Sequence, residues 1–161
     1  MINVLMHGCN GRMGQMITGL VKEDPGISIA AGVDTYQEVQ NPYPVFDTIA
    51  KCDVSADVVI DFSTASALED VLTYCVEKQV PAVLCSTGYS EEQLKKIAEA
   101  SEKTAVLKSA NMSMGINLLL KLLKDAAKVL APAGYDMELV ERHHNQKLDA
   151  PSGTALALAD S

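Results

Sequence analysis

Tryptophan is absent from this sequence, and aromatic residues make up only 4% of its 161 residues. Hydrophobic residues make up 48%, so aliphatic side chains must fill most of a sizeable core. Long apolar runs are also absent: none approaches the ~20 residues that a membrane-spanning helix needs. No basic segment precedes the first apolar run, as a secretory signal would require. We therefore expect a protein that neither spans a membrane nor is secreted.

Cysteine and positive charge are scarce as well. The four cysteines form no C-x-x-C pair, which argues against zinc ribbons and disulfide scaffolds and fits a reducing compartment. The formal net charge of -8 argues against a nucleic-acid partner, because such partners usually need a basic face. We expect a cytoplasmic protein that binds neither nucleic acid nor membrane.

Strand and helix patterns alternate along most of the chain. Short apolar runs predict strands over residues 2–6, 27–33, 57–62, 81–85 and 104–107. Apolar side chains at helical spacing predict helices over 13–21, 68–76, 91–102 and 116–130. Residues 36–55 lack a clear period, which indicates a loop with room for a short strand and helix. The alternation is typical of an α/β fold, a Rossmann-like parallel sheet with helices on both faces.

The segment 131–134, Ala-Pro-Ala-Gly, ends the last long helix and marks the expected domain boundary. Residues 1–132 would form the first domain. Residues 135–142 predict a strand, and 154–159 predict the first turns of a helix just before Ser161. Because domains rarely end as a helix begins, we expect residues 133–161 to be the beginning of a second α+β domain that is truncated.

A glycine-rich turn follows the first predicted strand, with the spacing G-x-x-G-x-x-G at residues 8–14. Glycine permits a sharp turn and a close approach of the backbone to a pyrophosphate, which then lies at the helix N-terminus. Asp34 ends the second predicted strand, where a carboxylate can bind the hydroxyls of an adenosine ribose. The pattern predicts a site for NADH or NADPH; the alternative is a tight strand–helix turn without a ligand.

The stretch ERHHNQKLDAPSGTA, residues 141–155, carries the strongest chemical signal. It gathers Arg142, His143, His144 and Lys147 in an otherwise acidic chain, just before a predicted helix N-terminus. Such N-termini attract anions, so the pattern predicts a site for a small anion with a proton donor beside it. The alternative is a buried structural histidine beside a solvated loop.

Other chemistries fit this stretch poorly. Adjacent side chains on a strand face opposite ways, and no further histidine or cysteine lies near the pair, so we expect no metal site. Ser152 lacks the G-x-S-x-G elbow of a nucleophile.

The stretch resembles the substrate loop of dihydrodipicolinate reductases, the NAD(P)H enzymes of lysine and diaminopimelate biosynthesis. Both histidines, Lys147 and the whole run 149–155 match that loop. Residues 8–14 resemble the family's cofactor fingerprint. Residues 85–89 resemble its G-T-T-G loop, and residues 109–115 resemble its A-N-F-S-x-G loop, with Met112 in place of the aromatic residue. Residues 61–64 match a further loop of the family more loosely, and the resemblance implies that they line the cofactor cleft.

The resemblance implies hydride transfer from a dihydronicotinamide to a cyclic unsaturated imine that carries two carboxylates. His143 matches the family's proton donor, and Lys147 matches the residue that anchors a carboxylate and assists proton transfer. His144, Gly153 and Thr154 match the carboxylate clamp. The implied cofactor-binding residues are Gly8, Cys9, Asn10, Gly11, Arg12, Met13, Asp34, Cys85, Ser86, Thr87, Ser109, Ala110, Asn111 and Met112.

Thr35 stands where some family members carry an arginine for the 2′-phosphate of NADP, so we expect NADH to bind at least as well as NADPH. The resemblance also implies a homo-oligomer at full length and a small dianionic substrate. Two alternatives stay open. One is a related reductase of another imine or amino acid. The other is a nucleotide-binding module without catalysis, because its second domain is cut short.

Overall fold

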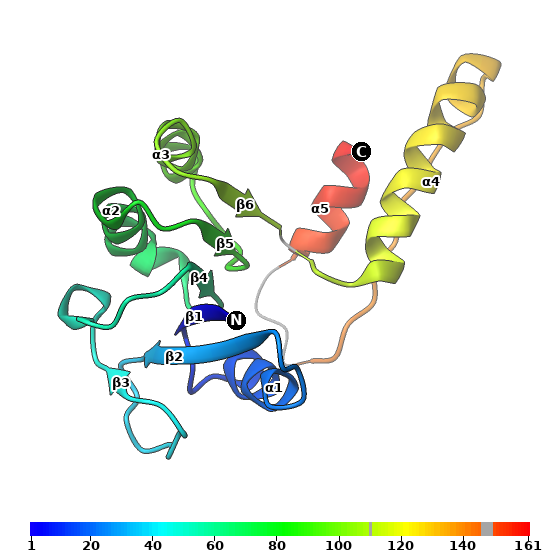
Figure 1. Ribbon diagram of the computed structural model, residues 1–161. Coiled ribbons are helices and arrows are strands. Elements are labelled where there is room, and N and C mark those ends of the chain that lie inside the picture. Colours follow the sequence, from blue (N-terminus) through cyan, green and yellow to red (C-terminus); the bar gives the residue numbers. More distant parts are fainter. Residues whose placement is uncertain (110, 146–149) are drawn as a thin grey trace. The chain divides into compact units, whose positions relative to one another are not determined.

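The computed structural model describes residues 1–109, 111–145 and 150–161 (Figure 1). Contacts divide the chain into two units, Met1–Ser109 and Ala110–Ser161. This division lies before the long helix α4 (Met114–Leu130), whereas the sequence analysis places the domain boundary after it, at residue 132. The reason is that α4 makes its main contacts with later elements, the short 3-10 helix η3 (Ala131–Ala133) and α5 (Gly153–Asp160).

The first unit is built on a six-stranded sheet in which every pair of neighbouring strands is parallel. The strands are β1 (Ile2–His7), β2 (Ile27–Val33), β3 (Val45–Phe46), β4 (Val58–Asp61), β5 (Ala82–Leu84) and β6 (Val106–Lys108). Their order is β3-β2-β1-β4-β5-β6, the Rossmann order, which confirms the predicted fold class. The chain leaves β1 toward β2 and later returns to β1's other side as β4. Ligands of such sheets bind at this switch point, beyond the carboxyl ends of the strands.

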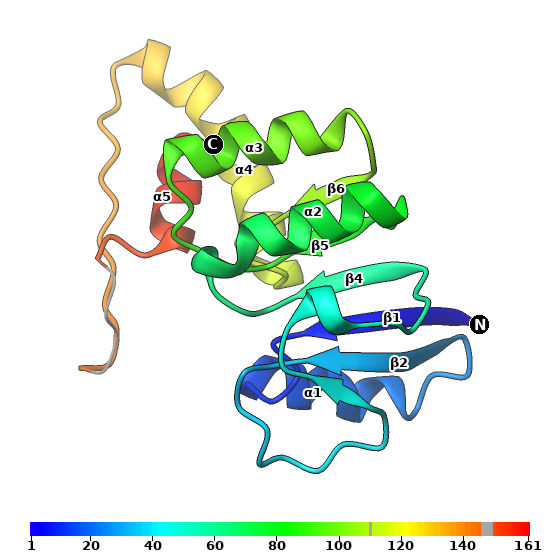
Figure 2. The ribbon, with the colours of Figure 1, turned by 90° about the vertical axis from the view of Figure 1, so that its left-hand side faces the viewer.

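Helices cover both faces of this sheet (Figures 1 and 2). Helix α1 (Arg12–Val21) lies on one face, and α2 (Leu68–Lys78) and α3 (Glu91–Ser101) lie on the other. The unpatterned segment 36–55 contains β3 and the 3-10 helix η1 (Ile49–Lys51), and a second 3-10 turn, η2 (Ala65–Ala67), leads into α2. A capping box at Ser90 and Gln93 starts α3.

The core on the α2 and α3 side is mainly aliphatic, as the lack of tryptophan predicts. The sheet contributes Leu5, Val33, Val59 and Leu84, and the helices contribute Leu68, Val71, Leu72 and Ile97. All four cysteines are buried and none is in a disulfide.

Helix α1 packs differently from its apolar pattern. Met13, Met16 and Leu20 are exposed, while the residues it buries are Gly14 and Thr18. A Cβ on Gly14 would lie 2.3 Å from the carbonyl oxygen of Gly8, so the helix approaches the end of β1 too closely for larger side chains. Thr18 donates its hydroxyl hydrogen to the Gly14 carbonyl oxygen at 2.8 Å, which leaves its oxygen to accept the hydroxyl hydrogen of Tyr43 at 2.7 Å.

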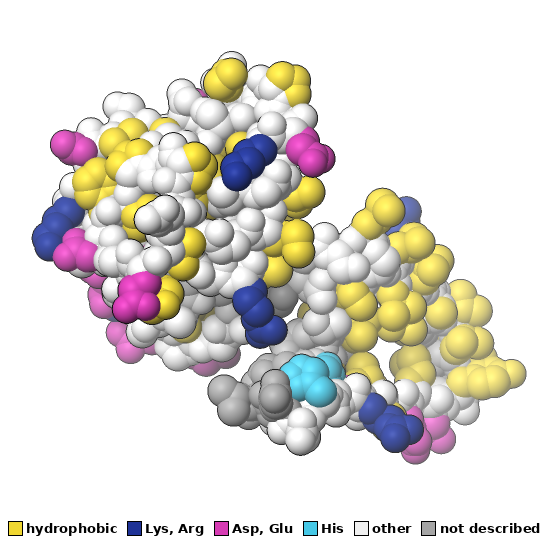
Figure 3. All heavy atoms as spheres, turned by 90° about the horizontal axis from the view of Figure 1, so that it is seen from below, with side chains coloured by type: hydrophobic (Ala, Val, Ile, Leu, Met, Phe, Trp, Pro, Cys, Tyr) yellow, Lys and Arg dark blue, Asp and Glu magenta, His cyan; other side chains and the backbone are white. Residues whose placement is uncertain are grey.

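The second unit contains α4, η3 and α5. Ser113 caps α4, and Ser152 caps α5 by accepting the Ala155 N–H at 3.0 Å. The helix expected near the chain end is therefore present. The strand expected over 135–142 is wrong: these residues form no ladder, because the described part of the unit offers no strand to pair with. Apolar side chains of α4 are exposed in this unit, among them Leu118, Leu122 and Val129, and Figure 3 shows apolar side chains gathered there.

Two glycines of α1 provide a matched test of the close packing. Gly14→Ala should lower the free energy of unfolding by about 2–3 kcal/mol or more, since its Cβ meets backbone atoms that cannot move aside. Gly19→Ala should raise it by about 0.5–1 kcal/mol, because a Cβ there meets nothing within 4 Å and alanine favours the helix. Urea unfolding followed by circular dichroism measures both. Equal effects of the two substitutions would contradict this account of α1.

Candidate functional site

The glycine turn between β1 and α1 forms a cradle of backbone atoms. Gly8 has φ +78°, and a Cβ there would lie 2.7 Å from the Phe62 carbonyl oxygen. Gly11 is the N-cap of α1 and has φ -71°, and a Cβ there would meet only the Gly8 carbonyl oxygen, at 3.4 Å. Gly8 and Gly14 are closely packed against backbone atoms, whereas the position of Gly11 is open. Pyrophosphate binding requires this arrangement.

Asp34 lies directly beside this turn. One carboxylate oxygen accepts the Asn10 N–H at 2.9 Å, and the other accepts the Tyr36 N–H at 3.0 Å. The acid therefore links the glycine turn to the loop that follows β2. Each carboxylate oxygen keeps a further lone pair that a ribose hydroxyl could use.

Amide side chains brace the same two loops, which the sequence analysis did not anticipate. Asn10 donates to the Tyr36 carbonyl oxygen and accepts from Asn41 at 2.7 Å. Gln15 donates to the Cys9 carbonyl oxygen and to the Asn41 side chain, both at 2.9 Å. These bonds connect residues up to 31 positions apart, so no local pattern could have revealed them.

A cavity of about 460 Å³ opens at the carboxyl ends of β1, β2 and β4. Its volume lies within the range of small-molecule sites, roughly 300–1,000 Å³. It brings together the predicted residues Gly8, Gly11 and Asp34 with Thr35 and the loosely matched loop after β4. Its lining consists of His7, Gly8, Gly11, Val33, Asp34, Thr35, Asp47, Phe62, Ser63, Thr64, Ser66 and Ala67.

A buried histidine–aspartate pair borders this cavity. His7 Nδ1 lies 2.7 Å from Asp61 Oδ1, and Asp61 also accepts hydrogen bonds from Ser63 and Ser86. Burial opposes ionisation of Asp61, but the bonds from these partners together hold its pKa below the usual range. The sequence analysis missed His7; its signal is a titratable residue at the end of an otherwise apolar central strand.

Two predicted cofactor residues, Cys9 and Cys85, are buried. Burial raises the pKa of each thiol to about 11, and the charges of Asp34 and Asp61, respectively, add to the effect. Both thiols are therefore protonated near neutral pH and are poor nucleophiles. Any contact of Cys9 or Cys85 with a cofactor would involve the backbone.

The remaining predicted cofactor residues of the first unit lie in its loops. Arg12 and Met13 are exposed in the first turn of α1. Ser86 is buried against Asp61, and Thr87 beside it is exposed. Ser109 donates its N–H to the Leu84 carbonyl oxygen at 3.0 Å. Ala110 lies outside the described residues.

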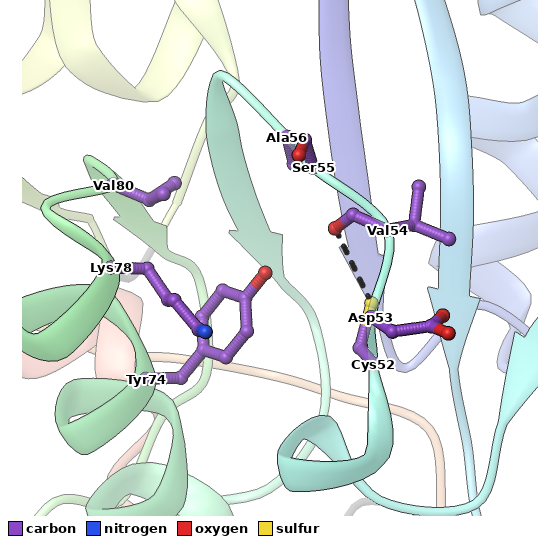
Figure 4. Close-up of a pocket in the computed structure, with 8 residues that line it drawn as sticks. All are labelled: Cys52, Asp53, Val54, Ser55, Ala56, Tyr74, Lys78 and Val80. Atoms are coloured by element: carbon purple, nitrogen blue, oxygen red, sulfur yellow. Dashed lines mark hydrogen bonds between the residues drawn. The ribbon is translucent and has the colours of Figure 1, made fainter.

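A smaller cavity, of about 200 Å³, lies beside the segment that precedes β4 (Figure 4). Residues of that segment, such as Cys52 and Asp53, line one side of it. Tyr74 and Lys78 of α2 and Val80, which follows α2, line the rest. It therefore lies at the amino end of β4. None of the glycines that form the cradle lines it, so it is a poor candidate for a dinucleotide.

In the second unit, the structure joins two predicted site residues. Asn111 donates from its side-chain amide to Thr154 Oγ1 at 2.9 Å, although the two are 43 positions apart. The Asn111 side-chain oxygen accepts the Ser113 N–H at 2.8 Å. The A-N-x-S loop and the first turn of α5 are thus one hydrogen-bonded group, with Met112 exposed beside it.

Glu141 links the predicted proton donor to the cap of α5. Its Oε1 accepts the Ser152 N–H at 2.8 Å, and its Oε2 lies 3.3 Å from His143 Nδ1. No role was predicted for Glu141, although it begins the motif. His144 is exposed, and Gly153 begins α5. Lys147 lies outside the described residues.

The described segments 1–109, 111–145 and 150–161 contain no group of three or more histidine, cysteine or acidic side chains placed to hold a metal ion. In those same segments no helix has both the length and the apolar character that a membrane crossing requires.

Comparison with known proteins gives a consistent result. A model of the N-terminus of dihydrodipicolinate reductase matches residues 2–112, and a model of its C-terminus matches residues 115–161. The 4-hydroxy-tetrahydrodipicolinate reductases of Clostridium novyi and Clostridium tetani are 50% and 49% identical over 161 residues, all of this chain. The chain spans 64% and 63% of the length of these curated relatives.

The fold points to the same relatives. The crystal structure of a dipicolinate-bound dihydrodipicolinate reductase from Paenisporosarcina sp. TG-14 superposes with a TM-score of 0.79 and 29% sequence identity, over 99% of this chain and 64% of that one. With two family models that match in sequence order and a close structural relative, the chain belongs to the dihydrodipicolinate reductase family.

Proposed function

We propose that the protein reduces dihydrodipicolinate (4-hydroxy-tetrahydrodipicolinate) to tetrahydrodipicolinate with NADH or NADPH, a cytoplasmic step of lysine and diaminopimelate biosynthesis. The observation that carries the proposal is the cradle of Gly8, Gly11 and Gly14 with Asp34 beside it, in a chain of the reductase family. The test is substrate-dependent loss of the dihydronicotinamide absorbance on addition of dihydrodipicolinate.

In this proposal the first unit holds the cofactor. The N-terminus of α1 faces the pyrophosphate, and Asp34 binds the adenosine ribose from the end of β2. When bound, the dihydronicotinamide supplies a hydride. Asp34 lines the cavity, and its charge disfavours the additional phosphate of NADPH. We therefore propose that NADH binds at least as well as NADPH.

The second unit would hold the substrate and donate the proton. Glu141 Oε2 lies 3.3 Å from Nδ1 of His143 and favours a proton on that nitrogen; in the imidazolium Nε2 also carries a proton, which it would donate to the substrate. The substrate is a small dianion, and the relative from Paenisporosarcina was crystallised with dipicolinate, also a ring with two carboxylates. Lys147 would anchor one carboxylate and assist the proton transfer.

The clamp for a carboxylate would be the first turn of α5. Thr154 Oγ1 accepts a hydrogen bond from Asn111, so its own hydroxyl hydrogen is available for donation to the substrate. The Gly153 and Thr154 N–H groups lie in the same turn, and His144 would contribute from the preceding segment. By the family resemblance, the full-length protein would be a homo-oligomer.

A second candidate is a nucleotide-binding module without catalysis. It is favoured by the fact that the cradle, Asp34 and the cavity all lie within the first unit. NADH binding without turnover would support it. A reductase of another imine is the third candidate, and turnover of a different cyclic imine in a substrate panel would support that one.

The first functional prediction concerns Asp34. Asp34→Ala should weaken NADH binding by about 1–2 kcal/mol, the scale of a lost charge-assisted hydrogen bond. Asp34→Asn keeps a similar shape but no charge, so it should improve NADPH binding relative to NADH. Titrations followed by nicotinamide fluorescence measure both. A clear preference of the unmutated protein for NADPH would refute the assignment of Asp34 and Thr35.

The second concerns the glycine turn. Gly11→Val should leave the fold intact, because φ -71° is accessible to valine and a Cβ there meets only one atom within 4 Å. The branched side chain would occupy the pyrophosphate space, so NADH affinity should fall by about 2 kcal/mol or more. If a folded Gly11→Val protein binds NADH normally, this turn is not the phosphate site.

The third concerns proton transfer in the whole protein. His143→Gln removes the donatable proton, so kcat should fall by about 10²–10⁴-fold while NADH affinity is unchanged. Lys147→Ala should lower kcat and raise KM, and His144→Gln should act mainly on KM. Steady-state kinetics with dihydrodipicolinate distinguish the three. If His144→Gln loses kcat and His143→Gln keeps it, His144 is the proton donor and His143 the carboxylate ligand. If both variants keep kcat, residues 141–155 do not transfer the proton.

A further inference from the structure

His7 and Asp61 form a hydrogen-bonded pair where two central strands end. They are direct register partners on β1 and β4, and only 7% of His7 and 1% of Asp61 is exposed. Asp61 is ionised, since its partners hold its pKa below the usual range despite burial. An ionised carboxylate cannot donate, so Nδ1 of His7 carries the hydrogen of the 2.7 Å bond.

Asp61 also joins two loops near the cavity. It accepts the Ser63 N–H at 3.1 Å and the Ser63 hydroxyl at 2.6 Å in the loop after β4. It accepts the Ser86 hydroxyl at 2.9 Å in the loop after β5. These donors are neutral. Within residues 1–109, the basic side chain that contacts Asp61 is His7, so a positive charge beside Asp61 comes from protonation of His7.

Around the pair lie acids and neutral groups, together with Lys51, which is itself paired with an acid. Asp34 and Asp47 line the same cavity from beyond β2 and β3, and Asp47 is paired with Lys51 at 2.7 Å. The Asp61 charge also influences Cys75 of α2 and, in the loop after β5, Cys85 and Tyr89. Burial raises the pKa values of these three groups most, and the Asp61 charge raises them further. With His7 neutral, the carboxylates of Asp34 and Asp61 therefore leave this edge of the sheet negative.

We infer that His7 is a residue of the dinucleotide site, whose imidazolium neutralises Asp61 so that the doubly negative pyrophosphate binds preferentially to the His7-protonated protein. The inference rests on the proposed function for the identity of the ligand. His7 lines the cavity together with Gly8 and Gly11 of the cradle. Because binding favours the form with the imidazolium, the affinity should fall as rising pH removes that positive charge.

The test is the Kd of NADH between about pH 5.5 and about pH 8.5, the range in which histidines titrate. The unmutated protein should bind about tenfold more weakly at the high end, the effect of one charge lost near a dianion. His7→Asn keeps a hydrogen-bond donor at the position of Nδ1 but carries no charge. Its Kd should be weak at every pH, and its profile should be flat.

Two further variants separate charge from structure. Adding Asp61→Asn to His7→Asn removes both charges and should restore affinity to within about threefold of the low-pH value. Lys103→Gln removes one exposed positive charge after α3 and should leave the Kd and its pH profile unchanged. Melting temperatures identify any variant that is not folded, and the profile of the unmutated protein requires no variant.

A flat profile in the unmutated protein overturns the inference, and so does a His7→Asn protein that keeps the original profile. A double variant no better than His7→Asn also overturns it, because the defect would then be structural. Absence of NADH binding to the unmutated protein at every pH would overturn the proposed function as well, whereas binding with a flat profile overturns this inference alone.

Discussion

The backbone contact between α1 and the end of β1 is the constraint on which the first unit depends. Gly8 adopts a positive φ against the Phe62 carbonyl oxygen, and Gly14 brings α1 against Gly8. Together these contacts fix the direction in which the N-terminus of α1 points. Asp34 then binds the Asn10 N–H in the same turn, so the position of the acid relative to the cradle is set by backbone atoms.

The same contact explains why α1 buries few of its apolar side chains. A helix held by glycine and threonine lies close to the sheet, and its longer side chains must point sideways or outward. Met13, Met16 and Leu20 are accordingly exposed in this chain. On the opposite face, α2 and α3 contact the sheet through larger residues such as Leu68 and Ile97. The two faces of the sheet therefore use different packing distances.

Much of the fold could be predicted from the sequence because its signals are local. Apolar runs identified every strand of the sheet except the short β3, and helical spacing identified α1 to α4 within a few residues. The strand expected over 135–142 failed because a strand also needs a partner, which local pattern cannot supply. The bond of Asn111 to Thr154, the pair of Glu141 with His143 and the pair of His7 with Asp61 depend on tertiary register. The sequence therefore named Asn111, Thr154 and His143 as site residues without showing which residues they contact.

The four buried cysteines allow local unfolding of the first unit to be measured by thiol labelling. Burial raises the pKa values of Cys9, Cys75 and Cys85 to about 11, 12 and 11, and Cys9 and Cys75 are 0% exposed in the folded unit. A thiol-specific reagent can therefore react only after local or global unfolding exposes a sulfur atom. Cys9 lies in the glycine turn and Cys75 in α2, so the labelling rate at each would give the stability of the cofactor cradle and of the opposite helical layer separately.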